Sequence, residues 1–261
     1  MLSKARTLWR LYRLNGLSGL LRRCYLHLGY RRYHPSAGNS GLDSPKSSVV
    51  VYTAAFGGAA SSLRPCRFAD CPHICFTDNP NLQVHGWTMK VVAKNGLSAR
   101  RAARKAKLLS HHYLPQFDWW IWQDASMRLD VPAQSLVGEC QGCDLAAFRH
   151  PERRCTYREA DAVKWLGLDS ANLVDRQVNR YRDQQFPESR GLLETAIVIR
   201  RNRPEVIAFN ETWWAELQAG SERDQLSVMV SLWKHGTSCR ELPGCREDNP
   251  FAAYHNEKER V

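Results

Sequence analysis

The sequence lacks any run of about 18 apolar residues, so a membrane-spanning helix is not expected. Glycine (16 residues) and proline (12 residues) are too scarce in 261 residues for a fibrous protein. Disorder of the whole chain is also excluded, because 43% hydrophobic and 24% charged residues are ordinary values for a globular protein. The length suits one large domain or two small ones, with enough chain to bury a substantial core.

Acidic residues are absent from residues 1–42, whereas eight basic residues lie between Lys4 and Arg32. Leucines recur there at nearly helical spacing, so we expect a basic amphipathic helix over residues 1–33. Such a helix suits an anionic membrane surface, or it packs on the domain with a solvated basic face. Its charges interrupt every apolar run, unlike a secretory signal. We therefore expect a cytoplasmic protein, peripheral to the inner face of a membrane.

Turn-forming residues follow this segment and predict a linker over residues 34–46. We expect a folded domain over residues 47–245 and a polar tail over residues 246–261. Strand patterns alternate with helical ones in the domain, which indicates an α/β fold with a mixed, mainly parallel sheet flanked by helices. The expected strands cover residues 48–53, 73–77, 87–92, 119–123, 145–148 and 196–199. The main expected helices cover residues 98–113 and 204–219, and a further one starts at 221.

Cysteine is frequent, with nine residues, but its spacing points to no metal site. Cys140 and Cys143 form the only close CxxC pair, and no second pair completes a zinc ribbon. Reduced thiols are therefore the expectation.

Polar residues stand where the predicted strands end. The turn 54–58 follows the first strand, Asp78 the second, Asp124 the fourth and His150 the fifth. Ligands of open α/β sheets bind beyond the carboxyl ends of the strands, so we expect one cleft to contact all of them. Asp124 offers an oxygen ligand for Mn²⁺ or Mg²⁺, with an Asx turn as the alternative. Ser126 stands where a second acid would complete the usual Asp-x-Asp pair.

Three cations share one face of the helix predicted to begin at Ser98. Arg100, Arg104 and Lys107 are spaced i, i+4 and i+7, and they repel one another unless water or an anion screens them. A diphosphate suits them, because guanidinium and ammonium groups neutralise it directly. A solvated basic face is the alternative.

Four further residues can carry chemistry. Glu194 opens a predicted strand and can remove a proton from a hydroxyl group, or it pairs structurally with an arginine. Asp224 and Gln225 can face a sugar from a helix N-terminus, although Ser221 and Asp224 also fit a capping pattern. His150 can bind phosphate or a metal, or it is merely hydrogen-bonded.

Eight stretches over about residues 48–235 together resemble one family. It is a glycosyltransferase-like domain family, first catalogued as a domain of unknown function, with plant mucilage-related members. The stretches are VVVYTAAFGG (49–58), ICFTDN (74–79), ARRAARKAKLL (99–109), WIWQDAS (120–126), FRHPERRCTYREA (148–160), GLLETAIVIRRN (191–202), WW-x-E (213–216) and ERDQLS (222–227).

The resemblance implies a GT-A-like, Rossmann-like fold, a nucleotide-diphosphate-sugar donor and transfer to a hydroxyl group of a glycan or other acceptor. It implies that the nucleotide lies against Thr53, Phe56 and Asp78, and the diphosphate against Arg100, Arg104 and Lys107. It further implies that Asp124 matches a metal-ligand position and that Glu194 and Asp224 line the sugar and acceptor. If the transfer inverts the sugar's configuration, we expect one of these two carboxylates, Asp224 or Glu194, to deprotonate the acceptor; a retaining transfer needs neither as a base. The departure at Ser126 bears on strict metal dependence.

Two other functions stay open from the residues. A nucleotidyltransferase shares the α/β layout, but its second metal carboxylate and glycine-rich signature are weak or missing here. A basic module that binds nucleic acid or a membrane surface without catalysis is suggested by a pI near 9.4. No zinc-finger or RNA-recognition motif supports it, and most of the excess charge lies in the first 33 residues, so no specific nucleic acid is expected as a partner.

Overall fold

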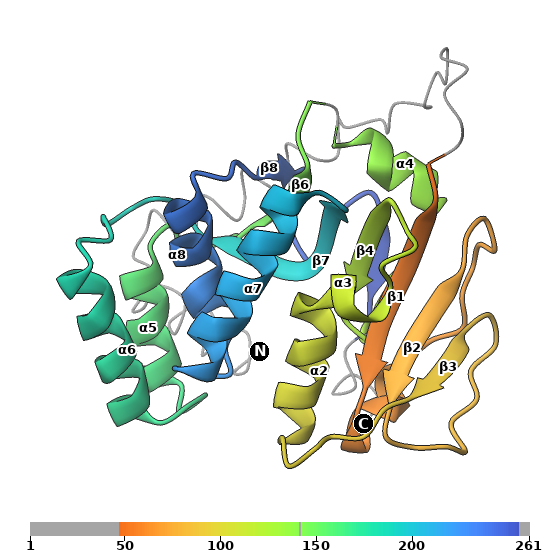
Figure 1. Ribbon diagram of the computed structural model, residues 1–261, viewed down its shortest axis with the longest axis horizontal. Coiled ribbons are helices and arrows are strands. Elements are labelled where there is room, and N and C mark those ends of the chain that lie inside the picture. The colour runs from red at the N-terminus through yellow and green to blue at the C-terminus, as the bar shows by residue number, and fades with distance from the viewer. Residues whose placement is uncertain (1–46, 141, 256–261) are drawn as a thin grey trace, which may run out of the picture.

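The computed structural model describes residues 47–140 and 142–255 (Figure 1). A seven-stranded sheet forms its centre, with the strand order β3-β2-β1-β4-β7-β6-β8. Neighbouring strands pair in parallel, except that β7 runs antiparallel to β4 and β6 on its two sides. This mixed, mainly parallel sheet with flanking helices confirms the predicted fold class.

The element bounds follow the predicted ones most closely in the centre of the sheet. The seven strands are β1 (Val49–Ala55), β2 (His73–Thr77), β3 (Thr88–Val91), β4 (Trp119–Gln123), β6 (Leu145–Arg149), β7 (Leu193–Arg201) and β8 (Arg240–Leu242). A second sheet pairs β5 (Met127–Leu129) with β9 (Ala252–Tyr254). The helices are η1 (Gly57–Ser62), α2 (Ala99–Leu108), α3 (Ser110–Tyr113), α4 (Ala133–Gly138), α5 (Thr156–Trp165), α6 (Ala171–Asp183), α7 (Pro204–Gln218) and α8 (Gln225–His235).

The central strands β1 and β4 are buried at every position. Their nearly all-apolar sequences account for this, because a parallel sheet covered on both faces needs apolar side chains on both sides of its strands. Ala102, Phe209 and Val228 of α2, α7 and α8 pack on one face, and Leu136 of α4 and Phe251 pack on the other. Helices α5 and α6 pack beyond α8 through a third cluster, at the left of Figure 1.

Helix α2 begins as the sequence predicts. The Ser98 Oγ accepts a hydrogen bond from the Arg101 backbone N–H at 3.0 Å, which satisfies one of the free donors of the first turn. Buried Ala102 and Ala106 allow the helix to pack closely on the sheet. The helix ends at Leu108 and the separate turn α3 follows, where one continuous helix is predicted.

The prediction of a polar tail over residues 246–261 is wrong for the part that the structure describes. Residues 246–255 are part of the fold, because Phe251 is fully buried and β9 pairs with β5. The predicted helix 1–33 and linker 34–46 lie outside the described residues. Within residues 47–140 and 142–255, no helix has the length and apolar character needed to span a bilayer.

Candidate active site

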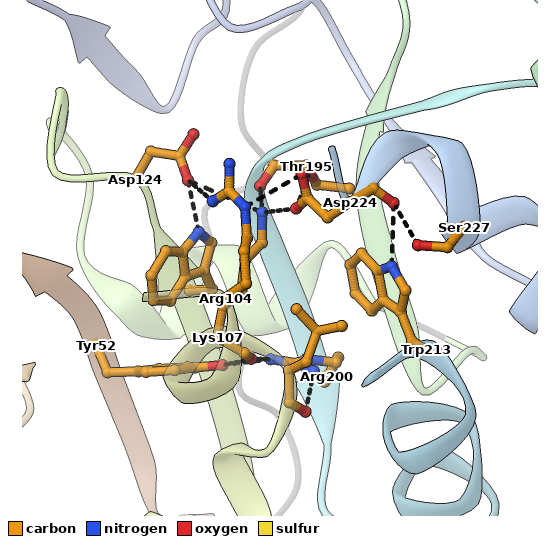
Figure 2. A network of polar contacts seen from close by, with 11 residues as sticks. Tyr52, Arg104, Lys107, Asp124, Thr195, Arg200, Trp213, Asp224 and Ser227 are labelled. Atoms are coloured by element: carbon orange, nitrogen blue, oxygen red, sulfur yellow. Dashed lines mark hydrogen bonds and ion pairs between the residues drawn. The ribbon is translucent and has the colours of Figure 1, made fainter. Parts of the chain in front are cut away.

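Four charged side chains form what we call the ionic cluster: Arg104, Lys107, Asp124 and Asp224 (Figure 2). Lys107 of α2 is only 1% exposed, and its Nζ lies 2.5 Å from Asp224 Oδ2. The same Nζ donates to the Thr195 carbonyl oxygen at 2.7 Å. Arg104 Nε lies 3.4 Å from Asp224 Oδ1. Asp224 is thus a buried carboxylate held between two cations.

Asp124 joins the cluster at the end of β4. Its Oδ1 accepts a hydrogen bond from Trp122 Nε1 at 2.8 Å and lies 3.9 Å from both Arg104 Nη1 and Lys107 Nζ. Its backbone N–H donates to the Ala196 carbonyl of β7 at 2.8 Å, which fixes it at the edge of the sheet. The side chain is 29% exposed, so Asp124 is the carboxylate of the cluster that solvent reaches.

The direction of the strands brings these groups to one edge. Because β7 is antiparallel to β4, its first residues, Glu194 and Thr195, lie at the edge where β4 ends. The i, i+3 spacing of Arg104 and Lys107 sets both on the same side of α2. Asp224 stands at the N-terminus of α8, opposite them, and accepts a hydrogen bond from the Thr195 hydroxyl at 2.9 Å.

A second buried cation, Arg200, holds the end of α2 beneath the cluster. It is fully buried and donates to the carbonyl oxygens of Lys107 and Leu108, to the Tyr52 hydroxyl and to Asn210 Oδ1. The Tyr52 hydroxyl also donates to the Lys107 carbonyl at 2.7 Å. A cation is favourable at a helix C-terminus, where carbonyl oxygens lack partners in the helix. Arg200 therefore fixes the turn of α2 that carries Lys107.

Electrostatics keep Asp224 ionised. Burial alone raises the pKa of Asp224, but the charges of Arg104 and Lys107 outweigh burial and hold that pKa far below its ordinary value. Burial lowers the pKa of Lys107, and the Asp224 carboxylate opposes that shift. Asp224 is therefore a weak proton acceptor, because its conjugate acid is not populated near neutral pH.

Glu194 has the opposite environment. It is 5% exposed, and burial is the main reason why its pKa is raised to about 7. The negative charges of Glu247 and Asp124 also raise this pKa, whereas the positive charge of Arg246 lowers it. Its Oε2 accepts a hydrogen bond from the Arg246 backbone N–H at 2.8 Å. A carboxyl group with this pKa can exchange a proton near neutral pH.

An open cleft of about 370 Å³ borders the ionic cluster. Arg100, Arg104 and Asp124 line it, together with Phe56 after β1 and Ser126 after β4. Arg100 is exposed, so two guanidinium groups and one carboxylate face a single solvent-accessible space. The structure thus brings together the predicted metal-ligand residue and two of the three predicted diphosphate-binding cations. It leaves Lys107 buried behind them.

The remaining residues predicted to bind the nucleotide sugar lie in different settings. Thr53 is fully buried within β1. Asp78 accepts a hydrogen bond from the Gly57 backbone N–H at 2.9 Å and pairs with Lys94 at 2.8 Å. The hydrogen bond from Lys94 is the main reason why the pKa of Asp78 is lowered. Asp78 therefore closes the turn after β1, and Gln225 is a half-buried residue beside Asp224 at the start of α8.

His150 is engaged within its own loop. Its Nδ1 accepts hydrogen bonds from the backbone N–H groups of Glu152 and Arg153, each at 3.1 Å. Its Nε2 lies 3.0 Å from Arg153 Nη2 and 3.8 Å from Glu159 Oε2. The turn after β6 thus occupies Nδ1, and Nε2 faces the ion pair of Arg153 and Glu159, so His150 takes the structural alternative rather than a metal-binding one.

The described residues give Asp124 and His150 no shared metal cage. Within residues 47–140 and 142–255, the groups of three His, Cys, Asp or Glu side chains whose ligand atoms lie close together contain neither Asp124 nor His150. Those groups are His111–His112–Glu211 and Glu194–Cys245–Glu247. Asp124 has two cations beside its Oδ1, so a divalent ion there would depend on Oδ2 and on oxygens of a donor diphosphate.

Sequence reasoning missed Thr195 and Arg200 as parts of the site. Arg200 carries a readable signal, because it directly follows the apolar run of residues 196–199 within the same strand. Two tryptophan rings also belong to the site, because Lys107 Nζ lies 5.4 Å from the Trp122 ring and 5.9 Å from the Trp213 ring. These rings supply cation–π contacts to the buried ammonium group.

Comparisons with known proteins identify a matching family model, a relative and a structural neighbour. The family model described as TOD1/MUCI70, glycosyltransferase-like domain, matches residues 76–240. The probable hexosyltransferase MUCI70 of Arabidopsis thaliana is 26% identical over 159 residues, which is 56% of this chain and 27% of that protein. The chain therefore spans little more than a quarter of that relative's length. The apo structure of the bifunctional glycosyltransferase WbbM covers 78% of this chain and 40% of its own, with 11% identity and a TM-score of 0.44.

Proposed function

The chain belongs to the TOD1/MUCI70 family of glycosyltransferase-like domains, whose model matches more than half of it, and on that basis we propose that it is a glycosyltransferase. The resemblance found in the sequence is thereby confirmed. The proposed reaction moves a sugar from a nucleotide-diphosphate sugar to a hydroxyl group of a glycan or other acceptor. Its setting is the synthesis of a polysaccharide or glycoconjugate.

One observation carries the proposal: Arg100, Arg104 and Asp124 line one cleft at the carboxyl edge of the sheet. Breaking a sugar–phosphate bond leaves negative charge on the diphosphate. Preorganised cations stabilise such charge most when they are partly shielded from water, as Arg104 is at 19% exposure. Arg100 and Arg104 are therefore the residues proposed to hold the leaving diphosphate.

Lys107 has an indirect role in this proposal. At 1% exposure it has no access to the cleft, and its ammonium group is already paired with Asp224. Together they hold Arg104, which contacts Asp224 from the cleft side. Lys107 and Asp224 are thus proposed as positioning residues for the diphosphate site.

Glu194 is the better candidate for removing the acceptor's proton, if the reaction inverts the sugar's configuration. Its pKa of about 7 lets it accept a proton near neutral pH, whereas Asp224 is held ionised by its cations. A retaining reaction would need neither residue as a base.

The proposal also includes a divalent metal ion at Asp124 and a location at a membrane surface. Mn²⁺ or Mg²⁺ would bind at Asp124 Oδ2 together with donor diphosphate oxygens, and it would supply further positive charge for the leaving group. The basic residues 1–33 suit an anionic membrane surface, as a peripheral protein on the cytoplasmic side would require.

A thermal-shift screen of nucleotide sugars, with and without Mn²⁺, tests donor binding. The correct donor raises the melting temperature by ligand linkage. Arg100→Gln is expected to abolish most of this shift. The matched control is Arg158→Gln, which removes another exposed helical arginine, from α5. If both variants lose the thermal shift equally, the cleft cations do not bind the donor in the way proposed.

Product analysis with the donor so identified tests the chemistry. Released nucleoside diphosphate supports glycosyl transfer, whereas released pyrophosphate would indicate a nucleotidyltransferase. Asp124→Ala is expected to abolish both donor hydrolysis and transfer. Wild-type turnover in that variant would refute the role given to Asp124.

A further inference from the structure

Two histidines and a glutamate converge at a second place, away from the cleft. His111 and His112 belong to α3, and Glu211 belongs to α7. Glu211 Oε1 lies 2.8 Å from His111 Nε2 and 2.9 Å from His112 Nε2. The two imidazole ring centroids are 4.3 Å apart, and all three ligand atoms lie within 4.8 Å of one another.

The two histidines are adjacent residues of a single helical turn. Adjacent residues of a regular helix point about 100° apart, so neighbouring side chains do not normally meet at one atom. Here α2 ends at Leu108, and Leu109 departs from helical geometry with ψ of 44° before the single turn of α3 begins. Both rings of that turn reach the same carboxylate oxygen.

We propose that His111, His112 and Glu211 form a binding site for a zinc-class transition-metal ion. Two imidazole nitrogens and one carboxylate oxygen are the donors that Zn²⁺ takes, whereas Mg²⁺ and Ca²⁺ prefer oxygen alone. Neighbouring ligand atoms around a tetrahedral zinc ion lie about 3.3 Å apart, given metal–ligand bonds of about 2.0–2.1 Å. The N–O distances of 2.8 and 2.9 Å need to open by only a few tenths of an ångström.

Exposure of the three residues fits an ion that enters from solvent. The His111 side chain is 9% exposed and forms the fixed inner ligand, while His112 and Glu211 are 52% and 46% exposed. A bound ion with three protein ligands keeps a fourth position for water. It would join the turn after α2 to α7, and it takes no part in sugar transfer.

The test measures Zn²⁺ binding to the full chain by competition with a chromogenic chelator, and its effect on the melting temperature. His112→Ala and Glu211→Gln change exposed side chains, so folding is not at risk. Each is expected to weaken Zn²⁺ binding by at least about tenfold, since loss of even a residue that only supports a ligand costs that much. The matched control is His85→Ala, which removes an exposed histidine from the loop between β2 and β3.

Two results would overturn the site. Either the wild-type chain shows no Zn²⁺-dependent rise in melting temperature, or His112→Ala and Glu211→Gln bind Zn²⁺ as tightly as His85→Ala does. A visible absorption spectrum of the Co²⁺ form supplies a second readout, because tetrahedral nitrogen and oxygen ligation gives intense bands that the two variants should lose. Neither readout depends on the donor or on catalysis.

Discussion

The buried pair of Lys107 and Asp224 makes a quantitative prediction about stability. Asp224→Asn removes the carboxylate and leaves the Lys107 ammonium group buried, with Asp124 at 3.9 Å as its next carboxylate. Breaking a buried pair by removing one partner costs about 3–5 kcal/mol, because the remaining charge has lost both water and partner. A domain of this size loses roughly 2–4 °C per kcal/mol, so the melting temperature should fall by roughly 6–20 °C.

The partner variant should cost less. In Lys107→Met, Asp224 still has Arg104 at 3.4 Å and the Thr195 hydroxyl at 2.9 Å. We therefore expect a loss near the lower end of the range, about 3 kcal/mol. The double variant leaves neither charge alone, so it should be no less stable than Asp224→Asn. The double-mutant cycle then gives a coupling energy of at least about 3 kcal/mol, the cost of Lys107→Met alone.

Urea unfolding of the wild type, both single variants and the double variant measures these differences. Lys164→Met serves as the control, because Lys164 and Asp175 are also only 2.6 Å apart but lie at the surface. Loss of an exposed pair costs about 0–1 kcal/mol. Additive effects of the two buried substitutions, or a control as destabilised as Lys107→Met, would refute the reasoning.

Two further predictions concern Glu194 and the basic segment. The pKa of Glu194 is raised from 4.5 to about 7. Between these pH values the native chain keeps a proton that the unfolded chain has released. The free energy of unfolding therefore falls as the pH rises through this range. The Glu194→Gln variant should lose this pH dependence, which is worth about 3 kcal/mol. Urea unfolding of both proteins at pH 5 and pH 8 measures it. A variant with the same pH dependence as the wild type would contradict the prediction. Deletion of residues 1–45 should abolish binding to anionic vesicles and leave the donor thermal shift intact, whereas loss of both would count against this division.

The centre of the fold could be predicted from the sequence because its strands are long and apolar. The runs 73–77 and 119–123 are predicted with the bounds that the structure has. The elements β5, β8 and β9 could not, since three residues carry too little periodicity to stand out from a loop. Their pairing depends on strands far away in the chain.

The site could be predicted only in part, for a similar reason. The strand-end rule places Asp124 near the α2 cations. Helical spacing groups Lys107 with Arg100 and Arg104, but spacing cannot tell which side of α2 meets α8, so the burial of Lys107 was missed. Glu211 lies 100 residues from His111, and only the packing of α7 beside α3 brings them together.

The dipeptide of Glu194 and Thr195 links two parts of the molecule that are distant in sequence. Alternate residues of a strand point to opposite faces, and here Thr195 contacts Asp224 while Glu194 contacts the Arg246 backbone. Arg246 lies beyond residue 240, where the family match ends. A chain shortened to the matched region would therefore expose a buried carboxyl group and remove its hydrogen-bond donor. Expression of the folded domain accordingly needs a C-terminal boundary after β9.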